Sequence, residues 1–310
     1  HHQYQYRGLR RFKKAILLHR RFRDSMRSHL LKIKPDVIDC VKLDLVADIL
    51  NVKGAIPLVY ESHSSFWASR FEGAGFLRQI HTLWLNLKVR HVQAVVALSS
   101  GDAKVWRKVN KSVFVIPNIV HLNEGDTYCD CMSKSAVFVG RLSKQKDVGS
   151  LLAIWELVHQ KFPDWTLHIY GERGDAGDEV FKKLGQMSDS VIVHAPVENI
   201  LEEYKKHSIL LLTSLYEPFG LVIPEAMSCG LPVIAFDCPY GPANFIKDGL
   251  NGYLIKSHDI YSFAEKQSHL MSSSATRGEL GKLASSSVKG CTSDLIMDKW
   301  ESLFSCLYQI

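Results

Sequence analysis

Short, mainly apolar runs alternate with segments of helical periodicity along most of the chain. The runs lie at residues 37–41, 56–60, 94–98, 113–116, 136–139, 167–170, 191–193, 209–212 and 232–236. Runs with little polar alternation predict strands that are buried on both faces, as the strands of parallel sheets are. The segments between them predict helices at residues 43–50, 71–90, 102–109, 151–159, 221–229, 261–271 and 294–308. This alternation of strands and helices predicts βαβ units and an α/β fold.

The stretch from residue 213 to residue 252 contains the most informative chemistry. Residues 213–220 predict a loop after the strand at 209–212, and the helix that follows ends before Gly230, a residue suited to the left-handed conformation of a helix end. In a βαβ unit such a loop lies at the carboxyl edge of a parallel sheet, where ligands bind. We therefore expect a ligand site here.

The residues of this loop favour a ligand that carries both phosphate and hydroxyl groups. Gly220 lets a backbone approach closely, and the free N–H groups of Phe219, Gly220 and Leu221 would open the helix with its positive end, which suits phosphate. Glu217 and Glu225 flank this site, and carboxylates accept hydrogen bonds from sugar hydroxyls. A nucleotide sugar has this pattern. Two solvated glutamates explain the spacing equally well.

The full string EPFGLVIPEAMSCGLPVIA, residues 217–235, closely resembles the signature of glycosyltransferase family 4. These are retaining enzymes of the GT-B architecture, in which two glutamates are separated by seven residues. The resemblance implies two Rossmann-like domains whose parallel sheets face each other across a cleft. It also implies that Glu225 binds ribose hydroxyls, while Glu217 holds the donor sugar near its reacting carbon.

A basic loop follows the predicted strand at 136–139. Its sequence, GRLSKQK at residues 140–146, places Arg141 and Lys146 after a glycine turn. Arg offers a bidentate fork and Lys a compact charge, so the loop suits a diphosphate, although an ordinary exposed basic loop is an equal alternative. It resembles the phosphate motif of family 4, with Asp147 in place of the usual glycine.

Two more segments resemble parts of the family 4 site. His63 stands just past the strand at 56–60, and members of the family place a histidine here, facing the donor sugar across the cleft. A lone histidine is otherwise more often a structural hydrogen-bonding residue. Residues 195–200 resemble the segment that contacts the nucleobase through its backbone, which assigns Val197 to the binding site.

The length of 310 residues favours two domains. The polar, broken segment at 121–134 is the best linker, after a turn at 117–120 that resembles the close of the family's first domain. We expect a first, acceptor-side domain at 1–122, a nucleotide-sugar-binding domain at 123–290 and a final helix at 291–310 that returns to the first domain. A complete GT-B first domain opens with a strand, a glycine-rich loop and a helix. Nothing before Lys34 has this pattern, so we expect the first βαβ unit to be missing.

Charge is concentrated at the start of the chain. The net charge is +6, yet residues 1–34 hold eleven Lys or Arg and a single acid, Asp24. Apolar residues recur there at mostly helical intervals, which predicts a basic amphipathic helix or pair of helices. Such a helix either packs its apolar stripe on a sheet or, through residues 7–34, contacts an anionic membrane surface or a lipid-linked acceptor. We expect no nucleic-acid partner.

The cysteines and the acidic residues bear on location and on metals. Seven cysteines show no disulfide framework, and no apolar run reaches the roughly 18 residues of a membrane span, so we expect a cytoplasmic protein, peripheral at most. Cys129 and Cys131 have no second pair at metal-ligand spacing and are interpreted as free thiols. No DxD pair follows a strand beside these motifs. We therefore expect no cofactor and no required metal.

These observations predict a retaining glycosyltransferase. It would move a sugar from a nucleoside-diphosphate sugar to a hydroxyl of a glycan or lipid-linked acceptor, in cell-envelope polysaccharide synthesis. The catalytic candidates are Glu217, His63, Arg141 and Lys146, and the donor-binding candidates are Arg141, Lys146, Val197, Phe219, Gly220, Leu221 and Glu225. A non-catalytic nucleotide-sugar-binding module and a GT-B epimerase or phosphorylase stay open. A Rossmann oxidoreductase is the weakest alternative, because the glycines at 171 and 174 lack the GxGxxG spacing.

Overall fold

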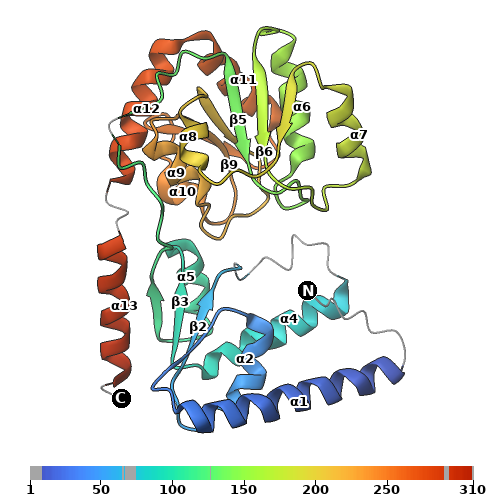
Figure 1. Cartoon of the computed structure of the whole chain (residues 1–310), viewed down its shortest axis with the longest axis vertical. Coiled ribbons are helices and arrows are strands. Elements are labelled where there is room, and N and C mark those ends of the chain that lie inside the picture. The colour runs from blue at the N-terminus through green and yellow to red at the C-terminus, as the bar shows by residue number, and fades with distance from the viewer. Residues whose placement is uncertain (1–8, 65, 67–74, 126, 290–292, 309–310) are drawn as a thin grey trace.

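The chain forms two α/β domains that follow one another along the long axis of the molecule (Figure 1). The computed structural model describes residues 9–64, 66, 75–125, 127–289 and 293–308. One sheet has four strands and the other has six, and all neighbouring strands pair in parallel. The predicted fold class, two α/β domains with parallel sheets, is confirmed.

The first domain is built on strands in sequential order, β1-β2-β3-β4. The strands are β1 (Ile38–Cys40), β2 (Leu58–Ser62), β3 (Ala94–Ala97) and β4 (Val113–Val115). The helices are α1 (Leu9–Ile33), α2 (Leu43–Leu50), α4 (Phe76–Lys88), the 3-10 helix η1 (Val89–His91) and α5 (Ser100–Trp106). The predicted basic segment at 7–34 is thus one helix from residue 9, and its first two residues lie outside the described part of the chain.

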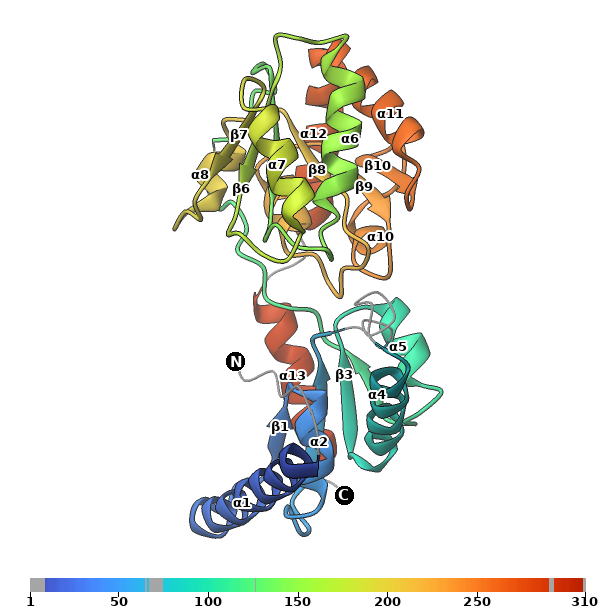
Figure 2. The same ribbon diagram turned by 90° about the vertical axis from the view of Figure 1, so that its right-hand side faces the viewer.

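Helices cover both faces of this sheet. On one face the buried ring of Trp106, from α5, packs in a cluster with Tyr60 and with residues of α2. On the other face, Leu303 and neighbouring residues of α13 (Ser293–Tyr308) pack against Val59 and Val96. Figure 2 shows α13 and α5 on opposite sides of the strands. The final helix therefore belongs to the core of the first domain, although the second domain separates the two in sequence.

The second domain has the strand order β10-β9-β8-β5-β6-β7. Its strands are β5 (Ser135–Val139), β6 (Thr166–Tyr170), β7 (Val191–His194), β8 (Ile209–Leu212), β9 (Val233–Asp237) and β10 (Gly252–Lys256). Its helices are α6 (Val148–His159), α7 (Asp178–Gln186), α8 (Ile200–Tyr204), α9 (Val222–Ser228), α10 (Pro242–Phe245), α11 (Ile260–Ser272) and α12 (Ser274–Val288). Helices α6, α7 and α11 cover one face of the sheet, and α8, α9 and α12 cover the other.

The strand order positions the site. The order reverses between β5 and β8, which lie side by side with Ala136 opposite Ile209. In open parallel sheets the chain leaves such neighbours toward opposite faces, and a crevice opens at their carboxyl ends. The loops that follow β5 and β8 are the two predicted phosphate-site loops.

Several boundaries and elements differ from the sequence-based predictions. Strand β2 is 58–62 rather than 56–60, because Ile56 closes a turn onto the carbonyl of Lys53. The predicted helix at 71–90 begins at Phe76 and ends at Lys88, and residues 71–74 lie outside the described part. No sequence-based prediction covered α7, α8, α10, β10 and α12. Their stretches are short or polar, and packing on the sheet stabilises them more than local pattern does.

Candidate active site

The two predicted loops meet at the crevice between β5 and β8. The loop at 140–147 leaves β5, and the loop at 213–220 leaves β8. The hydrogen bonds that join them include Leu215 N to Gln145 O (2.8 Å), Gln145 Nε2 to Tyr216 O (3.0 Å) and Thr213 Oγ1 to Lys146 O (3.0 Å). The two loops therefore form one wall of the crevice, with their backbones fixed relative to each other.

At the centre of this wall lies a nearly buried ion pair. Lys146 Nζ is 2.5 Å from Glu217 Oε1, and the two side chains are 15% and 7% exposed. The hydroxyl of Ser214 donates to the same carboxylate oxygen at 2.7 Å. Because a buried charge is costly without a partner, each member of this pair holds the other in place.

The backbone of Glu217 is also fixed by the segment that follows β9. Its N–H donates to Pro239 O at 2.7 Å, and its carbonyl accepts from Tyr240 N at 2.9 Å and from Gly241 N at 2.7 Å. Gly241 is needed there, since a Cβ at this position would lie 2.5 Å from the carbonyl oxygen of Phe219. The loop around Glu217 is thus held between two neighbouring loops.

Arg141 lies on the exposed side of the loop at 140–147. Its aliphatic carbons cross Gly174, whose ideal Cβ would lie 3.0 Å from Arg141 Cγ, and a Cβ on Gly171 would lie 2.1 Å from Gly140 O. These two glycines therefore allow two loop backbones to pack directly together. Within the described part of the chain, no hydrogen bond or ion pair holds the guanidinium of Arg141.

The loop turns into α9 at Gly220, which has φ 81°. The N–H groups of Phe219, Gly220 and Leu221 donate no hydrogen bond to any residue that the structure describes. The Phe219 ring itself is buried with Leu98 and Val120 at the junction of the domains. The backbone of residues 219–221 therefore offers donors to the crevice, while the aromatic side chain connects the loop to the first domain.

Glu225 lies within α9, in a different environment from Glu217. Burial raises the pKa of Glu225, and the charge of His121 opposes this shift. The ring of Tyr204 is buried beside it. No hydrogen bond or ion pair among the described residues connects Glu225 to Glu217 or to Lys146.

His63 lies at the carboxyl end of β2, in the first domain. Its Nε2 is 2.8 Å from Glu61 Oε1, and this hydrogen bond raises the pKa of His63. The neighbouring Asp39 has its pKa raised to about 6, because its carboxyl is partly desolvated and lies beside Glu61. The contacts of the described residues do not link His63 to the loops of the second domain.

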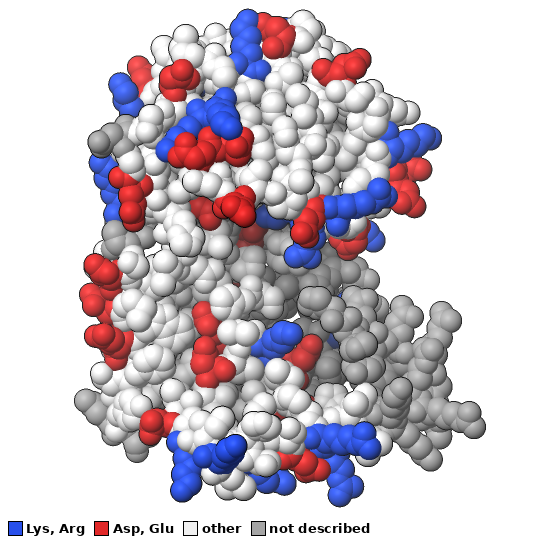
Figure 3. Space-filling view, viewed as in Figure 1, with Lys and Arg blue, Asp and Glu red and all other residues white. Residues whose placement is uncertain are grey.

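The domains meet close to these loops. A Cβ on Gly101, in α5, would lie 2.7 Å from the ring of Tyr240, so the loop after β9 contacts the first domain directly. Figure 3 shows the surface hollowed between the second domain above and the first domain below, with acidic and basic side chains along the upper edge. His63 belongs to the domain below the hollow and Lys146 to the domain above it.

The structure thus brings some of the predicted residues together and leaves others apart. Lys146 contacts Glu217, and the loops of Arg141 and of residues 219–221 adjoin that pair. Val197 is 40% exposed and follows β7, the edge strand of the sheet, which β6 separates from β5. Neither Ser214 nor the pairing of residues 239–241 with Glu217 was predicted from the sequence. Ser214 stands three residues before Glu217 in the predicted loop, which was a usable signal, whereas only the tertiary structure pairs residues 239–241 with the backbone of Glu217.

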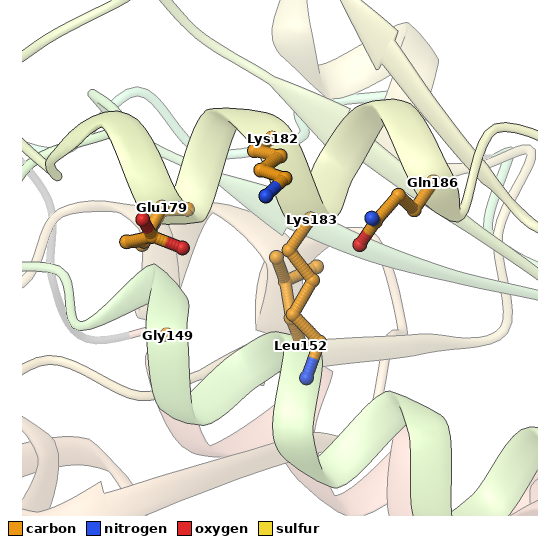
Figure 4. A pocket seen from close by; sticks show the side chains of 7 residues that line it. Gly149, Leu152, Glu179, Lys182, Lys183 and Gln186 are labelled. Carbon is orange, nitrogen blue, oxygen red and sulfur yellow. The ribbon is translucent and has the colours of Figure 1, made fainter.

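A separate groove of about 300 Å³ lies between α6 and α7. Figure 4 shows Glu179, Lys182, Lys183 and Gln186 of α7 above Gly149 and Leu152 of α6. None of the predicted site residues lines it. It is a surface depression between two helices and shares no lining residue with the predicted site.

Neither a metal-binding cluster nor a membrane span occurs in the described part of the chain. No three His, Cys, Asp or Glu side chains described there are grouped so that they could hold a metal ion. Likewise, none of the described helices is both long and apolar enough to cross a bilayer.

The arrangement of the domains has counterparts among solved structures. A mutant of Staphylococcus aureus TarM, in complex with Fondaparinux, alpha-GlcNAc-glycerol and UDP, has a TM-score of 0.77 to this chain at 24% identity. The match covers 90% of this chain and 58% of that one. The chain has the GT-B fold. The GT-B architecture expected from the sequence is thereby confirmed.

This GT-B chain also has sequence relatives. Residues 133–273 match the family described as "Glycosyl transferases group 1". Amylovoran biosynthesis glycosyltransferase AmsD of Erwinia amylovora is 32% identical over 203 residues, 63% of this chain and 56% of that protein. Poly(ribitol-phosphate) alpha-N-acetylglucosaminyltransferase of S. aureus (strain COL) is 31% identical over 201 residues, which cover 63% of this chain and 40% of that protein. The chain spans about half the length of these relatives or less.

Proposed function

We propose that this GT-B chain is a retaining glycosyltransferase of family 4. It would transfer a sugar from a nucleoside-diphosphate sugar to a hydroxyl of a glycan or lipid-linked acceptor. The observation that carries the proposal is the buried Lys146–Glu217 pair at the switch between β5 and β8, beside the loop of Arg141. Cation, carboxylate and free backbone donors at one crevice suit a ligand that contains both a diphosphate and a sugar.

The donor would be held through its phosphates and its nucleoside. Arg141 and Lys146 supply two cations, and the N–H groups of residues 219–221 supply neutral donors. Charge develops on the diphosphate as it departs, so groups already fixed around it lower the barrier without reorganisation. Glu225 would accept hydrogen bonds from the ribose hydroxyls, and the backbone at Val197 would contact the base. The proposed reaction uses these side chains and no organic cofactor or divalent ion.

The sugar would lie between the domains. Glu217 would orient it from the second domain, and His63 would face it from the first. The carboxylate of Glu217 is the candidate for an enzymic nucleophile here, but it already pairs with Lys146 and accepts a hydrogen bond from Ser214. We therefore propose departure and attack on the same face of the sugar, with the leaving phosphate taking the proton of the acceptor hydroxyl. This course retains the configuration of the anomeric carbon.

The relatives support the substrate class. One is named for amylovoran biosynthesis and another for the transfer of N-acetylglucosamine to poly(ribitol-phosphate). A structure of the same fold was solved with UDP. We infer that the acceptor belongs to a cell-envelope polymer, and UDP is the first nucleotide to test.

Calorimetry tests the donor site directly. Titration with UDP, GDP and ADP should show micromolar or tighter binding of one of them. Lys146→Ala should weaken this affinity at least about tenfold, since it removes a desolvated cation, a change of roughly 1.4 kcal/mol. Lys144→Ala, an exposed lysine of the same loop, is the matched control and should change it less than about twofold. Equal effects of both variants would contradict the site.

Product release then distinguishes the transferase from its alternatives. The chain is incubated with UDP-, GDP- and ADP-sugars, with and without cell-envelope extract, and free nucleotide is measured. Release that needs extract and is lost in Glu217→Ala supports transfer. Binding without release would favour a nucleotide-sugar-binding module, and an altered nucleotide sugar without extract would favour an epimerase.

The first domain also carries a surface suited to membrane contact. We propose that helix α1, within the predicted segment 7–34, rests on an anionic surface. Leu31 and Ile33 of this helix are 71% and 66% exposed, and Arg20 and Arg21 are exposed as well. Basic and exposed apolar side chains on one helix favour anionic interfaces. In flotation assays the protein should rise with anionic liposomes and not with neutral ones. Equal recovery from both would rule this contact out.

A further inference from the structure

The segment that joins the domains holds two cysteine thiols in contact. Cys129 Sγ lies 3.4 Å from Cys131 Sγ, and the N–H of Cys131 donates to Cys129 Sγ at 3.0 Å. Cys131 has φ 55°, a left-handed conformation that is unfavourable for a cysteine. This conformation folds the Cys-Asp-Cys turn so that both sulfurs lie on the same side.

The surroundings favour reaction of this pair with itself. Cys129 is partly exposed, whereas Cys131 is 1% exposed. The hydrogen bond from the Cys129 thiol and the guanidinium of Arg277 lower the pKa of Cys131. The Nε of Arg277 also donates to the carbonyl of Cys131 at 2.9 Å, which fixes the turn. A reagent therefore reaches Cys129 first, and Cys131, whose pKa is lowered, ionises more readily than an ordinary cysteine.

The pair lies against the helix that begins at the donor site. Cys129 N donates to Cys229 O at 2.8 Å, directly after α9, and Cys131 Sγ lies 3.6 Å from Gly230 O. Cys129 Sγ is also 2.6 Å from His207 O, just before β8. Both α9 and β8 lead to the loop of Glu217. A change in the dithiol therefore acts on the linker and on the far ends of the elements that carry the site.

We propose that Cys129 and Cys131 form a reversible dithiol–disulfide site, oxidised by low-molecular-weight disulfides. The Cys129 thiol passes its proton to the ionised Cys131 sulfur 3.4 Å away and attacks the disulfide RSSR, which forms a mixed disulfide on Cys129 and releases RS⁻, and this RS⁻ takes up the proton. The Cys131 thiolate then attacks Cys129 Sγ, forms the Cys129–Cys131 bond and expels the second RS⁻. The two cysteines lose two electrons, RSSR gains them, and the two thiol protons end on two RSH. This site is independent of the proposed transfer reaction.

Peptide mass spectrometry of the native chain tests the proposal. The protein, in a Cys306→Ser background that removes the exposed cysteine of α13, is treated with oxidised glutathione, quenched with acid and alkylated without reduction. The peptide that contains residues 129 and 131 should lose two hydrogens, in a proportion that follows the ratio of oxidised to reduced glutathione. The buried Cys40 should stay reduced and serves as the internal reference.

A variant separates the two steps. In Cys131→Ser the second attack cannot occur, so a glutathione adduct on Cys129 should accumulate at least tenfold over the parent. The proposal fails if the native peptide keeps both thiols while denatured protein is oxidised under the same conditions. It fails as well if the parent accumulates the same adduct without closing the disulfide. The measurement on the parent stands even if the variant does not fold.

Discussion

His63 shows how a neighbouring residue sets the chemistry of a site histidine. It follows a strand of the first domain, and its ionic partner is Glu61, two residues before it. A carboxylate at 2.8 Å favours the imidazolium, so His63 holds its proton to a higher pH than an ordinary histidine.

Removing the charge of Glu61 should therefore lower the pKa of His63. In Glu61→Gln the side chain can still accept a hydrogen bond, but the charge that favours the imidazolium is lost. NMR titration of the imidazole signals should show His63 deprotonating at a lower pH than in the parent chain. Glu124→Gln, at an exposed loop residue, is the control and should leave the midpoint unchanged. An unchanged midpoint in Glu61→Gln would contradict the assigned partner.

A second group of histidines lies on the sheet of the second domain. The ring of His207 is buried, 4.7 Å between centroids from His168, and its Nδ1 is 2.9 Å from Ser135 Oγ. Burial, and then the nearby His168, lower the pKa of His207 to about 4. Glu203 opposes this shift, while His194 and Lys206 add to it. The protonated form is therefore unfavourable in the folded state.

The second domain should lose stability in mild acid. An unfolded histidine takes up a proton near pH 6.5, whereas folded His207 does so only near pH 4, so stability is full above 6.5 and falls as the pH drops toward 4. The loss approaches about 3 kcal/mol. Urea unfolding at pH 7 and 4.5 measures it. His207→Asn should remove much of the difference, and the exposed His91→Asn should not. Identical pH dependence in both variants would refute this.

At the scale of elements, close backbone packing positions the cationic loop. Gly171 follows β6 and lies directly against Gly140, which follows β5. Contact between two backbones leaves no space for a side chain. This glycine pair therefore fixes the position of the backbone at Arg141, the next residue. In the sequence the glycine at 171 suggested a weak nucleotide-binding signal, but in the structure it has a packing role.

Gly171→Ala should displace this loop. The added methyl group would overlap Gly140 O, so the variant should lose about 1–3 kcal/mol of stability and bind nucleoside diphosphate more weakly. Gly278→Ala is the matched control, because Gly278 lies in α12 with nothing within 4 Å of its ideal Cβ. That change should raise stability by up to about 1 kcal/mol. Urea unfolding and calorimetry measure both. If Gly171→Ala changed neither the stability nor the nucleotide affinity, the loop would adjust to the added methyl group and the prediction would be wrong.

The elements predicted best are those whose own residues carry the pattern. Helix α2 has the predicted bounds, and β8 does as well, because each is a dense apolar segment between polar ones. Helix α12 escaped prediction since its residues are mostly small and polar. Its Ala284 and Val288 are buried against the second sheet, so tertiary contact rather than local propensity stabilises it.

At the scale of the whole molecule, the last helix makes the two domains interdependent. Helix α13 follows the second domain in sequence but covers one face of the first sheet. The first domain therefore has a complete core only when the chain extends through the second domain and returns.

A cavity in this helix should act on the first domain alone. Leu303 is fully buried against the sheet, so Leu303→Ala should cost about 2–5 kcal/mol. Urea unfolding followed by circular dichroism should show an earlier transition for the first domain, with the nucleotide affinity of the second domain retained. Leu295→Ala, at a residue 52% exposed in the same helix, is the control and should have little effect. Equal shifts from the two variants would mean that α13 does not stabilise this domain.

The sequence by itself determined the α/β class, the parallel strands and the identity of the two loops. Continuous apolar runs indicate strands that are buried on both faces. A loop that follows such a strand lies at the carboxyl edge of the parallel sheet. Only the tertiary structure decided that Lys146 pairs with Glu217, 71 residues later, and that residues 239–241 hold the backbone of Glu217. These contacts depend on strand order, which makes β5 and β8 neighbours. The order of the strands depends on how the whole domain packs, so a local sequence pattern does not predict it.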